Sequence, residues 1–268
     1  MKQSLLALCL LLFSLITYSQ SDTITSPVVI TGASTDRYYV PSDRTFNVYT
    51  AGTGYRGPKT SLYGLLNTGQ LRKDFEDGSN IQYALQYELD FYHKITRKTS
   101  YWANYAYSQS RNFPNHRVLT RVWQQLPANF LVSAGYNYYR TQDSINIHMA
   151  NFGLERYMGR FWVEGRALVF FKEPDTKYAY QLTSRVFWND VNYFQLLLMT
   201  GAAPDEPWRN EGVSSLTAHT IMTSVSSYIG KSRHFQLKAG VGYSYEEYRP
   251  AEWRNRYVGN VGLLLYIF

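Results

Sequence analysis

Residues 81–91 read IQYALQYELDF and carry the pattern that decides the fold. Apolar side chains occupy one set of alternate positions, namely Ile81, Tyr83, Leu85, Tyr87, Leu89 and Phe91. The other set is mostly polar and comprises Gln82, Ala84, Gln86, Glu88 and Asp90. Because successive side chains of a β-strand point to opposite faces, the stretch predicts a strand with one apolar and one polar face. Its length is close to the ~9–11 residues with which a tilted strand crosses a bilayer.

The same alternation recurs in four further segments, which are 130–138, 161–171, 178–186 and 235–246. Turn-forming residues separate the segments, and short and long connections alternate along the chain. The short connections are 56–59, 96–98, 126–129, 158–159, 189–190 and 230–232. The longer ones are 39–44, 70–80, 109–116, 141–144, 172–177, 202–212 and 247–255. This arrangement is typical of a transmembrane β-barrel, which has tight periplasmic turns and longer outer loops.

Seven outer loops and six turns predict an all-β fold, an antiparallel transmembrane β-barrel of about fourteen strands. The first strand, around 28–37, has the weakest pattern, so twelve strands is the alternative. The barrel must close, because an open sheet edge in lipid leaves backbone groups unpaired. A soluble β-sandwich is the competing interpretation, but aromatic residues near strand ends favour a membrane protein. These residues are Tyr138, Tyr139, Tyr157, Phe161, Trp188 and Tyr245.

The N-terminus predicts export. Lys2 is followed by the apolar stretch 5–16 and by small residues before a cleavage site after Ser19, as in a secretory signal peptide. We expect residues 1–19 to be this signal peptide and residues 20–268 to form the barrel domain, exported through the Sec pathway to a Gram-negative outer membrane. Cleavage would remove Cys9, the one cysteine of the chain, and with it any disulfide or cysteine metal ligand.

The other end of the chain resembles a barrel-assembly signal. Leu264, Tyr266 and Phe268 alternate, and we expect them to face outward and to end the last strand on an aromatic residue. Outer-membrane barrels characteristically end in this way, which makes the barrel-assembly machinery an expected partner.

The middle of the chain resembles the YaiO-type outer-membrane β-barrel family. The segments that carry the resemblance are Asn112 to Arg117, Trp123 to Pro127, Ser133 to Tyr136, Leu154 to Trp162, Arg185 to Trp188 and Gly201 to Glu206. They fit the family from about residue 40 to the end. The resemblance implies an outer-membrane barrel of unsettled biochemical role, in some members fused to helical repeats or encoded near surface-polysaccharide genes. We expect no repeat domain before the first strand. The family supplies no catalytic residue, but it marks a corner formed by Phe113, Pro114, His116 and Arg117.

The strand pattern places eight charged residues inside the barrel, where they would form a lumen wall. They are Glu88, Asp90, Arg117, Arg121, Glu164, Arg166, Arg185 and Lys238. One hypothesis is a non-enzymatic channel or surface-exposed binding protein for small anionic solutes or saccharides, since guanidinium groups hold carboxylates and phosphates. The other interpretation of the same charges is that they pair across neighbouring strands and only satisfy one another. An accessory barrel for polysaccharide export or envelope assembly is the alternative function, acting through its outer loops, with 202–212 as the segment to delete. Loops 70–80 and 202–212 would close the lumen if they fold inward.

Catalysis is the third interpretation, as a hydrolase of lipid or glycan. Its candidates are His116 and the Glu88/Asp90 pair. The other interpretation of His116 is a loop-packing residue held by the Phe113-Pro114 corner, and Glu88/Asp90 lacks a third positioned group. No zinc, calcium or phosphate-loop motif is present. We therefore predict no enzyme, cofactor or metal. Cleavage after Ser19 would remove Lys2 and lower the formal net charge from +7 to +6, and this positive charge suits anionic lipopolysaccharide and outer-membrane lipids as partners. Nucleic acid is excluded by the compartment.

Overall fold

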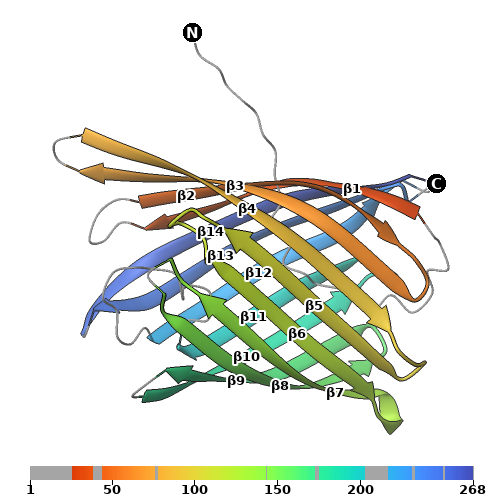
Figure 1. Cartoon of the computed structure of the whole chain (residues 1–268). Coiled ribbons are helices and arrows are strands. Elements are labelled where there is room, and N and C mark those ends of the chain that lie inside the picture. The colour runs from red at the N-terminus through yellow and green to blue at the C-terminus, as the bar shows by residue number, and fades with distance from the viewer. Residues whose placement is uncertain are drawn as a thin grey trace.

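Fourteen antiparallel strands form a closed barrel in the order of the sequence (Figure 1). The computed structural model describes residues 26–38, 44–75, 78–142, 144–172, 175–202, 217–230, 233–249 and 251–267. The strands are β1 (Ser26–Tyr38), β2 (Arg44–Arg56), β3 (Thr60–Phe75), β4 (Gly78–Lys94), β5 (Thr99–Ser108), β6 (His116–Gln125), β7 (Phe130–Arg140), β8 (Asn146–Met158), β9 (Phe161–Lys172), β10 (Asp175–Phe187), β11 (Tyr193–Ala202), β12 (Thr217–Ile229), β13 (Phe235–Arg249) and β14 (Glu252–Tyr266). The prediction of fourteen strands is confirmed.

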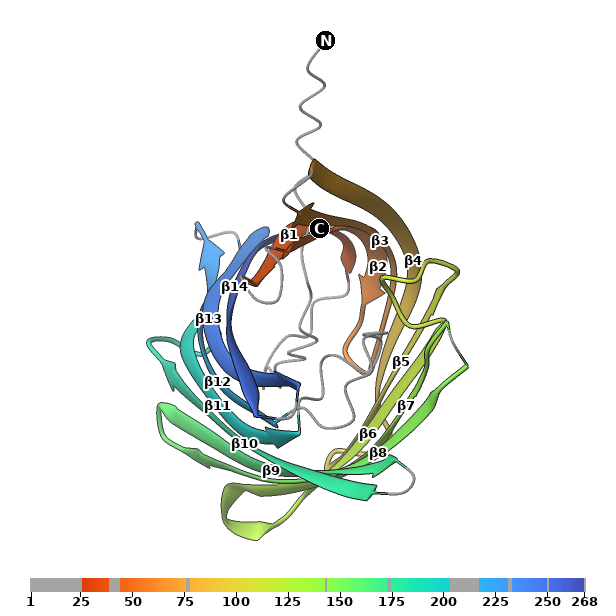
Figure 2. The ribbon, with the colours of Figure 1, turned by 90° about the vertical axis from the view of Figure 1, so that its left-hand side faces the viewer.

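The barrel closes between its first and last strands. β1 pairs with β14 from Val28↔Tyr266 to Tyr38↔Arg256, and the ring of strands is seen end-on in Figure 2. The strand with the weakest sequence pattern is therefore the one that completes the wall. Closure leaves no edge of the sheet open to lipid, where unpaired backbone groups are costly.

The first and the last residues of the barrel lie at the end of the barrel where the short turns are. Tyr266 N–H donates to the carbonyl of His234 (2.7 Å) next to the β12–β13 turn, and Ser26 pairs with Arg56 at the β2–β3 turn. Short turns mark the periplasmic end of such barrels. A short helix, η1 (Pro127–Asn129), lies in the β6–β7 turn at this end. Among the described residues, no helix is long and apolar enough to cross a membrane.

Alternation separates the two faces of the wall as predicted. On β4, Tyr83 is 75% exposed on the outer face, whereas Gln86 is only 2% exposed on the inner face. Directly paired residues of antiparallel strands lie on the same face, so this parity is passed from strand to strand around the barrel. The outer surface is apolar and aromatic, and the lumen contains most of the buried polar residues.

The predicted aromatic positions divide between the two faces. Tyr138, Phe161 and Tyr245 lie on the outer face. Tyr139 and Tyr157 face inward instead, since Tyr139 pairs with the inward Arg117 and Tyr157 with the inward Trp162. An adjacent pair such as Tyr138 and Tyr139 cannot share one face of a strand.

The predicted orientation of the C-terminal residues is wrong. Leu264 and Tyr266 face the lumen with exposures of 6% and 5%, and they pack against Val28, Ile30 and Leu65. The physical reason is the register, because Leu264 pairs with inward-facing Gln236. Phe268, like the predicted signal peptide 1–19, lies outside the described residues.

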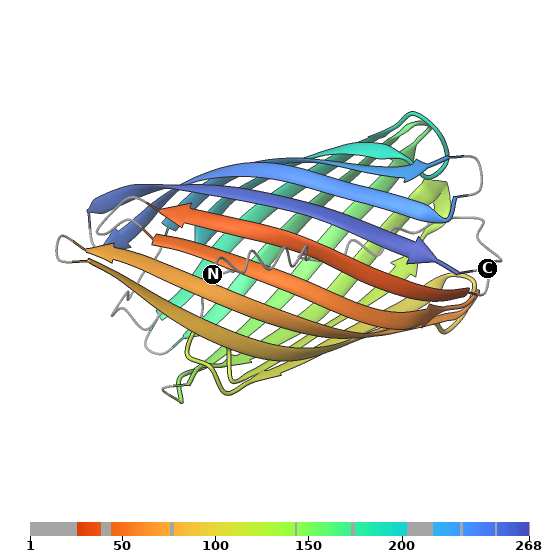
Figure 3. The same ribbon diagram turned by 90° about the horizontal axis from the view of Figure 1, so that it is seen from above.

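Three predicted outer loops are largely strand. Pairing continues from Lys73↔Asn80 to Phe75↔Gly78 in the β3–β4 hairpin, and β9–β10 and β13–β14 extend in the same way. These hairpins lengthen the wall at the end opposite the short turns (Figure 3). Their side chains are polar, and backbone pairing does not require apolar side chains, so polarity was a poor indicator of a loop. Of the predicted loop 202–212, only Ala202 lies within the described residues.

Candidate functional site

All eight predicted lumen residues face inward. Glu88 and Asp90 lie on β4, Arg117 and Arg121 on β6, Glu164 and Arg166 on β9, Arg185 on β10 and Lys238 on β13. The register places each of them on the same face as buried polar neighbours, for example Arg185 beside Gln195 and Lys238 beside Ser226. The sequence pattern was therefore sufficient for orientation. It did not show which of the charges meet.

Four charged residues form a compact group on β6, β8 and β9, here called the Arg121 cluster: Arg121, Glu155, Glu164 and Arg166. Arg121 Nη2 binds the carboxylate of Glu164 and lies 3.4 Å from Glu155 Oε1. Arg166 Nη2 lies 2.8 Å from both carboxylate oxygens of Glu164. Two cations thus meet two anions, and the formal charges of the cluster cancel.

Neighbouring side chains complete this cluster. The indole nitrogens of Trp123 and Trp162 donate to Glu155 at 2.7 and 3.3 Å, and Arg121 donates to Ser133 Oγ at 2.6 Å. Glu155 was missed by the sequence analysis, although it lies in the segment Leu154 to Trp162 and alternates with outward-facing Leu154 and Arg156. That alternation was the available signal.

A second group pairs charges on β4 and β6. Arg117 Nη2 lies 2.8 Å from Glu88 Oε1, and Glu88 also accepts hydrogen bonds from Asn104 (2.7 Å) and Asn67 (2.8 Å). Asp90 accepts from the indole nitrogen of Trp102. Both carboxylate oxygens of Glu88 therefore already accept hydrogen bonds. This arrangement does not favour a role for Glu88 and Asp90 as a general acid/base pair.

Arg185 and Lys238 differ from the other inward charges. Arg185 Nε donates to Gln195 Oε1 (2.7 Å), and its guanidinium carbon lies 4.2 Å from the ring centroid of Trp162 and 4.8 Å from that of Tyr193. Neither Arg185 nor Lys238 has a carboxylate within ion-pair distance among the described residues. The wall from β10 to β13 therefore holds two cations that form no ion pair with a carboxylate of the described residues.

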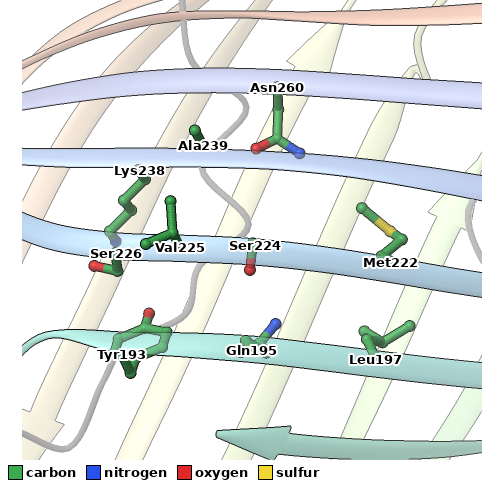
Figure 4. Close-up of a pocket in the computed structure, with 10 residues that line it drawn as sticks. All are labelled: Tyr193, Gln195, Leu197, Met222, Ser224, Val225, Ser226, Lys238, Ala239 and Asn260. Carbon is green, nitrogen blue, oxygen red and sulfur yellow. The ribbon is translucent and has the colours of Figure 1, made fainter. Parts of the chain in front are cut away.

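The side chain of Lys238 is one of those that line a recess in the lumen wall (Figure 4). The recess is open to the lumen, and the atom-free space of about 510 Å³ beside its lining residues includes part of the lumen itself. Its polar side chains come from β11 to β14 and are Tyr193, Gln195, Ser224, Ser226, Lys238 and Asn260. The sequence analysis named Lys238 but missed the other five. Alternation shows that a residue faces inward, but it does not show which residues of neighbouring strands lie next to a given lysine.

The family-motif corner is split between the two faces. Phe113 is buried and packs edge-on against Phe46, with ring centroids 5.6 Å apart, and Pro114 is fully buried. His116 lies on the outer surface, where its Nδ1 is 2.9 Å from the hydroxyl of Tyr105, whereas Arg117 faces the lumen. The corner therefore anchors the β5–β6 connection. Within the described residues, no group of three His, Cys, Asp or Glu side chains is arranged to hold a metal.

Comparison with known proteins decides the family. The model of the YaiO membrane β-barrel domain matches residues 29–206, more than half of the chain. The chain belongs to the YaiO family. The matched range begins with the first strand and ends after β11, so it differs from the expected range of residue 40 to the end. With its closed fourteen-strand wall, this YaiO protein is an integral outer-membrane β-barrel.

The comparison with solved structures found matches of low sequence identity. Pseudomonas aeruginosa OccK7 (OpdD) is 8% identical, with a TM-score of 0.49 over 91% of this chain and 98% of that chain. Pseudomonas aeruginosa OpdQ is 8% identical, with a TM-score of 0.47 over 92% and 99%. The anion-selective porin from Comamonas acidovorans is 11% identical, with a TM-score of 0.44 over 91% and 99%. The search of curated proteins found no match.

Proposed function

We propose that this YaiO barrel is a non-enzymatic channel or surface-exposed binding protein for small anionic solutes or saccharides. The observation that carries the proposal is the pair of lumen cations, Arg185 and Lys238, on β10 and β13. Neither is matched by a carboxylate among the described residues. Cations that line a lumen and lack anionic partners raise the local concentration of anions and favour their passage.

Ion pairs reduce the number of lumen charges to which we assign anion selectivity. Arg117, Arg121 and Arg166 are paired with glutamates at 3.4 Å or less, so their fields are largely cancelled at a distance. Of the eight charged residues predicted to form the lumen wall, Arg185 and Lys238 therefore give the lumen one basic side. We assign selectivity to Arg185 and Lys238, and structural roles to the three paired arginines.

Single-channel recording in planar bilayers tests this proposal. The refolded barrel should conduct with a reversal potential that shows anion preference in asymmetric KCl. The double variant Arg185→Gln/Lys238→Gln should lose much of that preference. The control is Arg156→Gln/Lys98→Gln, which also removes one arginine and one lysine, but from the outer face and an exposed periplasmic turn. Cation selectivity of the unmodified barrel, or equal selectivity of both double variants, would contradict the proposal.

An accessory barrel for polysaccharide export or envelope assembly is the second candidate. It is favoured by the outer end of β4, where residues 78–84 pair with β3 on one side, while pairing with β5 on the other side begins only at Gln86. A strand edge of this kind can accept a strand from a partner. A folded but silent barrel in the same recordings would favour this candidate over the channel.

A further inference from the structure

We propose that Tyr193, Gln195, Ser226 and Lys238 form a binding site for the carboxylate of a small sugar acid in the lumen wall. The proposal rests on the function proposed above and names the class of solute and the place where it binds. Three neighbouring strands, β11, β12 and β13, build the site, and the residues come together only in the closed sheet (Figure 4).

Register places the ammonium group of Lys238 among hydrogen-bond donors. Lys238 pairs with Ser226 on β12, and Ser226 pairs with Tyr193 on β11. On the other side of Lys238, the row continues with Gly262 on β14 and Gly32 on β1, which carry no side chains. Figure 4 shows the lysine side chain extending toward Ser226. The charge therefore lies next to Ser226 and Tyr193, with no acidic residue in its row.

The hydrogen bonds that are present leave donors available in the recess. Gln195 uses its amide oxygen to accept from Arg185 Nε (2.7 Å), so its amide NH₂ remains to donate. Ser226 Oγ accepts from Gln236 Nε2 (2.9 Å), so its hydroxyl hydrogen points elsewhere. The effect is a set of oriented donors around one cation.

The hydroxyl of Tyr193 adds an unsatisfied donor. It is buried and has no hydrogen-bond partner among the described residues, while the residue as a whole is only 1% exposed. Buried polar groups without partners are rare in proteins, and this hydroxyl can donate to a water or to a solute held in the recess. An ammonium, an amide NH₂ and two hydroxyls together match an oxyanion, since a carboxylate can accept several hydrogen bonds at once.

The rest of the recess indicates what the carboxylate is attached to. Successive inward positions along a strand are about 6.6 Å apart. One step from the Lys238 row toward the outer end lie Ser224 and Asn260, and a further step leads to Leu197 and Met222. Neutral hydrogen-bonding groups followed by an apolar pair suit the hydroxyls and the apolar face of a sugar ring. A hexuronate combines these features with a carboxylate.

Isothermal titration calorimetry on the folded barrel in detergent micelles tests the site, with galacturonate as the probe. Lys238→Gln should weaken galacturonate binding at least roughly tenfold, because a charge-assisted hydrogen bond is lost. Tyr193→Phe should weaken it about two- to tenfold, because one neutral hydrogen bond is lost. Lys98→Gln, in an exposed turn, should bind like the unmodified barrel. Galactose, which lacks the carboxylate, should bind far more weakly than galacturonate.

Each contrary result overturns a stated part of the proposal. No galacturonate binding by the unmodified barrel, or equal binding by Lys238→Gln, removes the site. Acetate binding as tightly as galacturonate removes the sugar and leaves a simple oxyanion site. Heat-modifiable migration in gels verifies that each variant is folded, and Lys238→Met provides a second variant if Lys238→Gln does not fold. Calorimetry does not require conductance, so failure of the site is distinguishable from failure of the channel.

Discussion

Gly153 shows how closely the charged side chains are packed on the inner wall. A Cβ at this position would lie 2.5 Å from Ser133 Oγ and 2.7 Å from Arg121 Nη2. The absence of a side chain on β8 therefore creates the space in which the guanidinium of Arg121 reaches its two glutamates. The ion pairs of Arg121 therefore depend on Gly153, which itself carries no charge.

We expect Gly153→Ala to destabilise the barrel by about 1–3 kcal/mol, the usual cost of forcing extra volume into a packed site. The guanidinium of Arg121 would have to move and its contacts with Glu155 and Glu164 would weaken. Urea-induced unfolding in lipid vesicles, followed by tryptophan fluorescence, measures the change. Gly165→Ala is the matched control, because a Cβ there has no neighbour within 4 Å. Equal stability of the two variants would show that the cluster does not need the space.

The β3–β4 hairpin shows how an element can differ from its sequence pattern. Residues 70–80 were expected to form a loop that controls the lumen, but residues 70–75 and 78–80 continue the wall as paired strands (Figure 1). An ion pair between Arg72 Nε and Asp74 Oδ1 (2.8 Å) lies near its tip. A hairpin held in this register cannot also fold into the lumen as a loop.

Shortening this hairpin should leave the barrel intact. Replacing residues 74–79 by Asn-Gly would join Lys73 and Asn80, which already pair, through a turn suited to a two-residue hairpin. We expect the free energy of unfolding to change by no more than about 0.5 kcal/mol, as for surface changes away from packed features. Single-channel conductance should also be unchanged. A marked rise in conductance would show that the hairpin tip obstructs the lumen after all.

At the scale of the whole molecule, closure between β1 and β14 determines the lumen. This seam pairs segments from opposite ends of the chain, and it makes Val28, Ile30, Leu264 and Tyr266 one buried group. Tyr266 links this group to the polar lumen, because its hydroxyl donates to Gln236 Oε1 (2.8 Å) and accepts from Arg56 Nη1 (3.1 Å). A twelve-strand barrel would have no such seam.

A disulfide across the seam tests closure directly. Ala33 and Val261 are paired on β1 and β14, and Cβ atoms of directly paired residues are about 4.5–5.5 Å apart, within reach of a disulfide after small adjustments. Because Cys9 lies in the predicted signal peptide, Ala33→Cys/Val261→Cys should form one intramolecular disulfide, seen as a shift in non-reducing gels. Ala33→Cys with Val241→Cys, placed on β13, should not. Crosslinking of the control alone would contradict the fourteen-strand order.

Alternation along the sequence determined the type of fold, a membrane barrel, and the inward orientation of all eight lumen charges, because the side to which a residue points is a local property of an extended chain. The connections predicted about fourteen strands and left twelve as the alternative, which closure between β1 and β14 excludes. Alternation failed for Leu264 and Tyr266. Residues 263–267 are apolar on both faces of the strand, so no polar residue shows which alternate positions face the lumen. Only the tertiary structure decided that Arg121 meets Glu155 and Glu164, and that Lys238 lies beside Tyr193 and Ser226 with no acid in its row. Those neighbours depend on strand register and on closure of the ring, which join residues far apart in the chain and leave no mark at any single position.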